Sequence, residues 1–189
     1  MGTSILRARL ALVATLGLVT VSAASHAQTT ALAAAPDPHS LFAGPAFSFA
    51  GGEPERAGVR AAIDRSVDSL VFLIRGIARG RITANNPVYS TISVQATNGQ
   101  IEVALAGWPL CRSSEDGRRT AWTNAVGDRG ELSQRFENGR LVQVITGDGG
   151  ERRNEFSISP DGRTLTMRVR ITSGRLPVPV QYALTYHRP

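Results

Sequence analysis

The chain has 189 residues, of which 21 are arginine, none is lysine and 15 are acidic, so its formal net charge is +6. Its single cysteine, Cys111, excludes an internal disulfide. The basic residues alternate with acids instead of clustering, which argues against a nucleic-acid partner.

Residues 1–27 have the three zones of a signal peptide. Arg7 and Arg9 precede an apolar run over 10–21, and small residues follow up to Ala27. We expect cleavage after Ala27 and a periplasmic or secreted mature protein. The apolar run is too short for a bilayer-spanning helix, which needs about 20 residues, so we expect no membrane span.

Two segments separate the signal peptide from the β-patterned region. Residues 28–52 are rich in Ala, Pro, Ser and Gly without a period, which predicts a flexible linker. Residues 53–82 are predicted to form one amphipathic helix whose apolar face packs on a sheet. The residues of this face are Val59, Ile63, Val67, Leu70, Ile74 and Ile77.

The second half of the predicted helix combines arginines with large apolar residues. Arg75, Arg79 and Arg81 lie beside Phe72 and Leu73. Binding to a membrane surface is one interpretation of this pattern. We favour the other, in which the segment packs on the sheet and only the charged ends of the arginines reach water.

From Val88 onward the apolar residues recur at every second position, as in Leu165, Met167 and Val169. Turn signals such as Asn98-Gly99 separate the strands and favour antiparallel hairpins. Gly107-Trp108-Pro109 interrupts the segment 100–115, where we expect a bend or a loop. We predict a mainly β domain over 88–188 with about eight strands in an antiparallel meander, closed or partly closed into a barrel. A curved open sheet around the helix is the alternative.

The segment Phe156 to Met167 and the segments Arg175 to Pro179 and Tyr182 to Tyr186 resemble small exported bacterial proteins of the lipocalin-like, calycin-type barrel class, which are mostly uncharacterised. The resemblance lies in the layout of hairpins and turns, and it implies a lipocalin-like barrel. The Gly-x-Trp signature of true lipocalins is missing. The two-helix lid of fatty-acid-binding barrels is also not expected, because only one helix is predicted.

The sequence shows no set of residues arranged for catalysis or for a metal. Cys111 and His187 are the thiol and imidazole available for a nucleophile and its base, and nothing in the sequence brings them together. Too few histidines, cysteines and spaced acids are present for a zinc or calcium site. We therefore predict no enzyme, no metal and no cofactor.

Large side chains on or beside the predicted inner face indicate either a filled core or a ligand pocket. These candidate ligand-binding residues are Trp122, Phe136, Phe156, Met167, Tyr182 and Tyr186. We predict a non-catalytic, lipocalin-like binding protein for a small apolar or lipid-like ligand. The alternative is a filled-core domain that binds an envelope protein or has a structural role in the cell envelope. An outer-membrane barrel is disfavoured, because aromatic residues make up only 6% of the chain.

Overall fold

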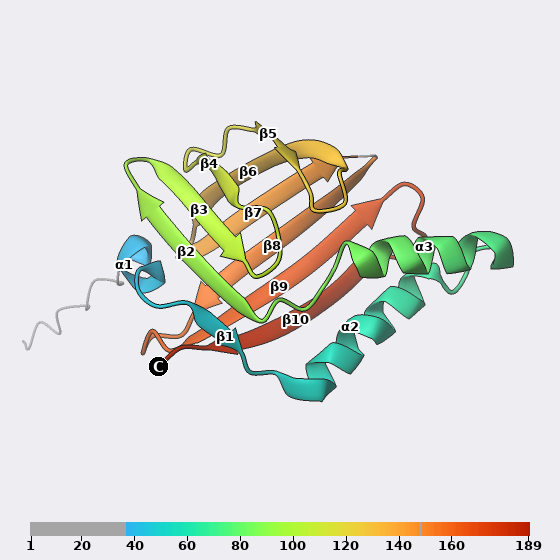
Figure 1. The fold of residues 1–189 in the computed structure, drawn as a ribbon, viewed down its shortest axis with the longest axis horizontal. Helices are drawn as coiled ribbons and strands as arrows, with labels where there is room; N and C mark the ends of the chain where they lie inside the picture. Colours follow the sequence, from blue (N-terminus) through green and yellow to red (C-terminus); the bar gives the residue numbers. More distant parts are fainter. Residues whose placement is uncertain (1–36, 148) are drawn as a thin grey trace, which may run out of the picture. The chain divides into compact units, whose positions relative to one another are not determined.

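Ten strands and three helices make up the part of the chain that the computed structural model describes, residues 37–147 and 149–189 (Figure 1). The predicted signal peptide and its cleavage site lie outside these residues. The strands are β1 (Phe47–Phe49), β2 (Thr91–Thr97), β3 (Gln100–Leu105), β4 (Cys111–Ser114), β5 (Thr120–Thr123), β6 (Arg129–Glu137), β7 (Arg140–Gly147), β8 (Gly150–Ile158), β9 (Thr164–Ser173) and β10 (Val180–His187). The helices are α1 (Pro38–Phe42), α2 (Gly52–Val67) and α3 (Phe72–Ala84).

All ten strands belong to one antiparallel sheet that curls into a nearly closed barrel (Figure 1). Their order is β4-β3-β2-β1-β10-β9-β8-β7-β6-β5. The two edge strands, β4 and β5, are not paired with each other, and β4 instead packs beside β6. The predicted mainly β, antiparallel barrel is therefore confirmed, with ten strands in place of about eight.

One of the additional strands comes from the interruption at Gly107–Pro109. The backbone N–H of Trp108 donates to the carbonyl oxygen of Leu105 at 2.9 Å, and the chain then reverses. Cys111 consequently lies opposite Val103, and β4 pairs with β3. The expected bend is a hairpin turn, which divides the predicted strand over 100–115 into two.

The other additional strand, β1, lies in the segment predicted to be a flexible linker. Phe47 and Ser48 pair with β2, and Ser48 and Phe49 pair with β10. Phe42 of α1 and Phe47 of β1 are fully buried. The linker prediction is wrong for this part of 28–52, because apolar residues without a local period gained their partners from strands far along the chain.

The alternation of buried and exposed residues within the strands is confirmed. In β9 the side chains of Leu165, Met167 and Val169 are buried, whereas Arg168 and Arg170 between them are exposed. Cys111, at the start of β4, is also buried. The core of the protein is therefore the inner face of the barrel.

Two helices, rather than the predicted single helix over 53–82, connect β1 to β2. Helix α2 packs on β10 and buries Val59, Ile63 and Val67, the first half of the predicted apolar face. The chain turns between α2 and α3, and Ile74 and Ile77 of α3 are 57% and 74% exposed. The prediction was wrong for this second half, because the sheet surface that covers α2 does not extend under α3. None of the described helices has the length and apolar character needed to cross a bilayer.

A row of buried amides crosses the interior of the barrel from β8 to β4. Asn154 Nδ2 donates to Gln143 Oε1 at 2.7 Å, and Gln143 Nε2 donates to Gln134 Oε1 at 2.9 Å. Gln134 Nε2 donates in turn to the carbonyl oxygens of Ile101 and Cys111, at 3.0 and 3.2 Å. Because β4 and β5 are not paired with each other, this row connects β6 to strands β3 and β4 at the other edge of the sheet.

Replacing Gln134 with Leu should lower the free energy of unfolding by about 2 kcal/mol, because an unsatisfied buried hydrogen-bonding group costs about 1–3 kcal/mol. The variant would leave the Gln143 amide N–H and two main-chain carbonyls without their partner. Gln95→Leu on the exposed face of β2 is the matched control and should change stability by less than about 0.5 kcal/mol. Urea unfolding followed by circular dichroism measures both, and equal midpoints for the two variants would contradict this role.

Candidate ligand-binding pocket

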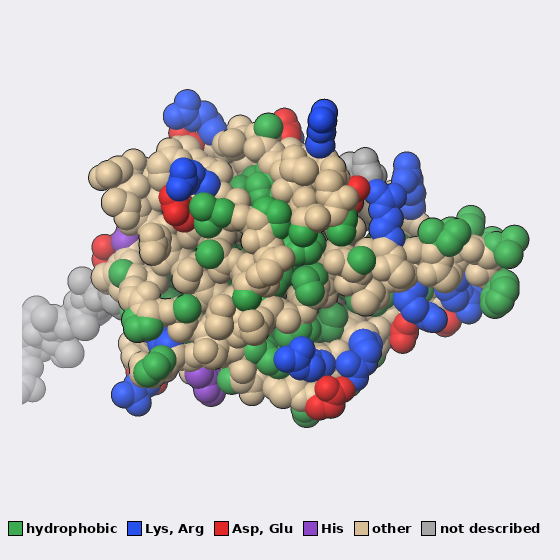
Figure 2. Space-filling view, viewed as in Figure 1, with side chains coloured by type: hydrophobic (Ala, Val, Ile, Leu, Met, Phe, Trp, Pro, Cys, Tyr) green, Lys and Arg blue, Asp and Glu red, His purple; other side chains and the backbone are tan. Residues whose placement is uncertain are grey.

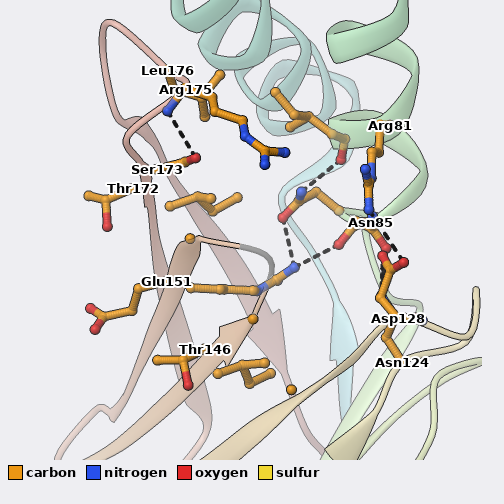
Figure 3. A pocket seen from close by; sticks show the side chains of 18 of the residues that line it. Arg81, Asn85, Asn124, Asp128, Thr146, Glu151, Thr172, Ser173, Arg175 and Leu176 are labelled. Carbon is orange, nitrogen blue, oxygen red and sulfur yellow. Dashed lines mark hydrogen bonds and ion pairs between the residues drawn. The ribbon is translucent and has the colours of Figure 1, made fainter.

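A pocket of about 390 Å³ lies between α3 and the neighbouring ends of strands β5 to β9 (Figure 3). Apolar side chains from the helical hairpin of α2 and α3 and from the barrel line it together with a similar number of polar and charged ones, among them Asp128 and Glu151. The apolar residues from α3 and the turn before it are Leu70, Ile74, Ile77, Ala78 and Ile82, and those from the strands and loops of the barrel are Leu105, Trp108, Trp122, Ile145, Ile171 and Leu176. The pocket suits an apolar molecule, or the apolar part of one.

Arg152 of β8 is a charged side chain of this wall. Its Nε donates to Asn154 Oδ1 at 2.9 Å, which joins the guanidinium to the row of buried amides. Its Nη1 donates to the carbonyl oxygen of Asn85 at 2.9 Å and to Asn86 Oδ1 at 2.7 Å, both just after α3. Three neutral acceptors thus fix the orientation of the guanidinium.

The Arg152 charge has no anionic partner among the described residues. Its hydrogen-bond partners are neutral amides and a carbonyl, and no described acid forms an ion pair with it. The neighbouring Tyr89 cannot supply a negative charge, since burial raises its pKa to about 12 and the opposing effect of Arg152 is smaller. Burial likewise raises the pKa of Tyr182. A guanidinium inside a low-dielectric wall without a counter-ion favours an anion bound beside it.

Three polar atoms in the pocket wall are buried and have no hydrogen-bond partner. They are Arg152 Nη2, the Tyr89 hydroxyl and Trp122 Nε1. All three carry a hydrogen that can be donated, and a buried donor is normally satisfied. The polar part of this wall therefore contains hydrogen-bond donors that no described group satisfies, and their natural complement is an acceptor such as a carboxylate, sulfonate or phosphate oxygen.

A second polar cluster attaches the C-terminal end of α3 to the turn between β5 and β6 (Figure 3). Arg81 Nη2 lies 3.4 Å from Asp128 Oδ1. Asn124 Nδ2 donates to Asn85 Oδ1 at 3.0 Å and to Asp128 Oδ2 at 3.2 Å. These contacts hold the end of α3 beside the pocket and keep Asn85 in place for its contact with Arg152.

The structure brings only part of the predicted ligand-binding set to the pocket. Trp122 lines the pocket. Tyr182 meets its polar wall, where the Tyr182 hydroxyl donates to Asn86 Oδ1 at 3.3 Å. The other predicted residues do not line the pocket: Phe156, Met167 and Tyr186 lie in the packed interior, and the partly buried Phe136 packs against it. Phe136 contacts the aromatic rings of His39 and Phe42 in α1, at the end of the barrel away from α3 (Figure 1).

Sequence reasoning missed Arg152, the residue that distinguishes this pocket. The alternation of inward and outward side chains along β8 could have identified it. Phe156 and Ile158 face inward, and counting back in steps of two places Asn154 and Arg152 on the same inner face. An arginine and an amide at inward positions of a strand are unusual, since such groups are rarely buried without partners. Tyr89 could not be found this way, because it lies in the irregular segment before β2.

The geometry around Cys111 does not favour nucleophilic chemistry. The side chain is fully buried, and burial raises the pKa of the thiol to about 12. The reactive thiolate is therefore scarce at neutral pH. Within residues 37–147 and 149–189, no three His, Cys, Asp or Glu side chains are close enough together to hold a metal.

No family model and no curated protein sequence matches the chain. Several solved structures are similar. The fatty acid-binding protein from brain tissue of Drosophila melanogaster has 12% sequence identity and a TM-score of 0.48, over 78% of this chain and 99% of that one. Lipid binding protein 8 of Caenorhabditis elegans has 11% identity and a TM-score of 0.48, over 79% and 96%. Human cRBP IV has 12% identity and a TM-score of 0.44, over 76% and 96%. These are similarities of fold alone, so the ligand must be argued from this chain's own residues.

Proposed function

We propose that the protein is a non-catalytic carrier or receptor for a small amphipathic molecule. The apolar part of the ligand occupies the pocket beside α3, and its anionic or acceptor-rich head meets Arg152. The observation that carries this proposal is the buried Nη2 of Arg152, which has no hydrogen-bond partner among the described residues and belongs to a pocket that apolar side chains of α3 and of the barrel also line. A signal peptide at 1–27 would place this binding in the periplasm or outside the cell.

The apolar wall and the guanidinium select for different parts of such a ligand. Burial of apolar surface stabilises the complex by about 25 cal/mol per Å² but does not distinguish one hydrocarbon from another. A charge-assisted hydrogen bond in a buried site adds directional selectivity for an anionic head. The favoured ligand class is therefore a medium-length hydrocarbon with one terminal anionic group.

Displacement of a fluorescent probe tests this proposal. Anilinonaphthalene sulfonate is an apolar anion and should gain fluorescence on binding the native protein. Dodecanoate should displace it with a lower half-maximal concentration than dodecan-1-ol, which has the same chain and no charge. Native mass spectrometry should find one dodecanoate per protein chain.

A filled-core domain that binds a protein partner is the second candidate. The large, fully buried side chains of Phe156, Met167 and Tyr186 favour it, because they fill the barrel beyond the pocket. That candidate predicts that neither the probe nor dodecanoate binds the native protein. The absence of binding in both measurements would overturn the carrier proposal and leave this one.

A further inference from the structure

Five apolar side chains at the start of α3 and in the residue before it are exposed to solvent. We call them the hairpin tip: Val71, Phe72, Leu73, Ile74 and Ile77. Phe72 and Leu73 are 83% and 78% exposed. Figure 2 shows hydrophobic side chains gathered at the end of the helical hairpin, beyond the strands. Monomeric soluble proteins seldom expose such a contiguous group, and where they do it marks an interaction surface.

The helical hairpin is also positively charged. Residues 52–84 contain six arginines and four acidic residues, a net charge of +2, and α3 itself has three arginines and no acid. Arg75 pairs with Asp68, just after α2, at 3.6 Å, and Arg79 pairs with Asp64 of α2 at 2.7 Å. Both pairs are solvent-exposed, so each contributes little to stability and its arginine can exchange a carboxylate for another anion.

The hairpin tip is continuous with the pocket wall. Leu70, Ile74 and Ile77 line the pocket, and Ile74 and Ile77 are at the same time members of the exposed tip. A surface that covers the tip would thus lie against the side of the pocket formed by α3. A molecule passing between that surface and the pocket would remain in contact with apolar side chains.

We infer that the hairpin tip docks on a lipid surface that carries anionic headgroups. Phe72 and Leu73 insert among the acyl chains, and Arg75 and Arg79 meet the headgroup phosphates. The tip is the end of a projecting hairpin, so a protein partner would need a matching apolar hollow, whereas a lipid surface needs no fixed complementary shape. Apolar insertion combined with arginines at the interface is the arrangement by which amphipathic helices bind membranes.

Vesicle flotation tests the inference with the full chain as it is produced and purified. The protein should float with vesicles of equimolar phosphatidylcholine and phosphatidylglycerol, and less with vesicles of phosphatidylcholine alone. The double variant F72S/L73S should lower the partition coefficient on the order of a hundredfold, because two large apolar side chains no longer insert. R75Q/R79Q should lower binding to the anionic vesicles by about tenfold or more and abolish their advantage over neutral ones.

Leu110→Ser combined with Val126→Ser is the matched control. It removes two other exposed apolar side chains, outside the hairpin, and should leave vesicle binding within about twofold of the parent. The inference does not depend on the proposed ligand. Phe72 and Leu73 do not line the pocket, so F72S/L73S should keep its affinity for anilinonaphthalene sulfonate, which shows that the variant is folded.

Two results would overturn the inference. One is the absence of flotation with either kind of vesicle. The other is a decrease in molar mass by light scattering for F72S/L73S relative to the parent, without vesicle binding by either protein. The latter outcome would identify the tip as a contact between two copies of the chain. Replacing Arg152 tests the proposed ligand site and leaves the hairpin tip unchanged. A failure of the ligand proposal can therefore be distinguished from a failure of the lipid-docking inference.

Discussion

Arg152→Met should weaken the binding of dodecanoate by about 10- to 100-fold, while the binding of dodecan-1-ol changes much less. A hydrogen bond to a charged group contributes about 1.5–3 kcal/mol, and each 1.4 kcal/mol corresponds to a factor of ten in affinity. Methionine has a long, unbranched side chain and keeps the apolar wall filled, so the change mainly removes the charge and the donors. The dissociation constants follow from displacement of anilinonaphthalene sulfonate.

Arg168→Met is the matched control for this experiment. Arg168 lies on β9, next to β8, but its side chain is on the exposed outer face of the barrel. The control removes the same charge from the protein without touching the pocket, so both affinities should stay within about twofold. Equal losses of dodecanoate and dodecan-1-ol binding in Arg152→Met would show that the head of the ligand does not contact Arg152.

Phe47→Ala should lower the free energy of unfolding by about 3–5 kcal/mol, the usual range for a fully buried phenylalanine in a core. Phe47 has no exposed surface, and the Arg188 guanidinium lies 4.6 Å from the centre of its ring. Arg188 also donates hydrogen bonds to the carbonyl oxygens of Leu41, Ala43 and Gly162. Loss of the ring would therefore loosen the packing of α1, β1 and the C-terminal end of β10 together.

Urea unfolding measures this effect, with Ser48→Ala as the control. Ser48 is the next residue of the same short strand and its side chain is exposed, so its replacement should change stability by less than about 0.5 kcal/mol. A loss below about 1 kcal/mol for Phe47→Ala would mean that β1 adds little to the barrel, as expected of a linker.

The pocket depends on a division of the barrel interior into two parts. Away from α3, large side chains such as Phe156 and Met167 fill the barrel and are fully buried. Toward α3, a pocket of about 390 Å³ remains beside Trp122, Ile145 and Arg152. Both alternatives considered from the sequence therefore apply to a part of the barrel. The interior is filled at the end away from α3, and a pocket is present at the end beside α3.

The sequence by itself determined the local β structure. The period of two from Val88 onward fixes which side chains of each strand share a face, and the Asn-Gly turns fix antiparallel neighbours, because both depend only on residues close together in the chain. The same alternation in β8 also indicates that the side chain of Arg152 faces inward. Trp122 was predicted from its size and its polar neighbours, and it lines the pocket.

Only the tertiary structure decided the remainder. The strand at Phe47 exists because β2 and β10 lie on either side of it, although both are distant in sequence. The turn between α2 and α3 has no glycine or proline to mark it, and it occurs where the supporting sheet ends. Tyr89, Trp122 and Arg152 line one pocket because the curvature of the barrel brings three distant segments together. Local sequence patterns determine which side chains of a strand share a face. A pocket depends on packing between segments that are distant in sequence, which no local pattern predicts.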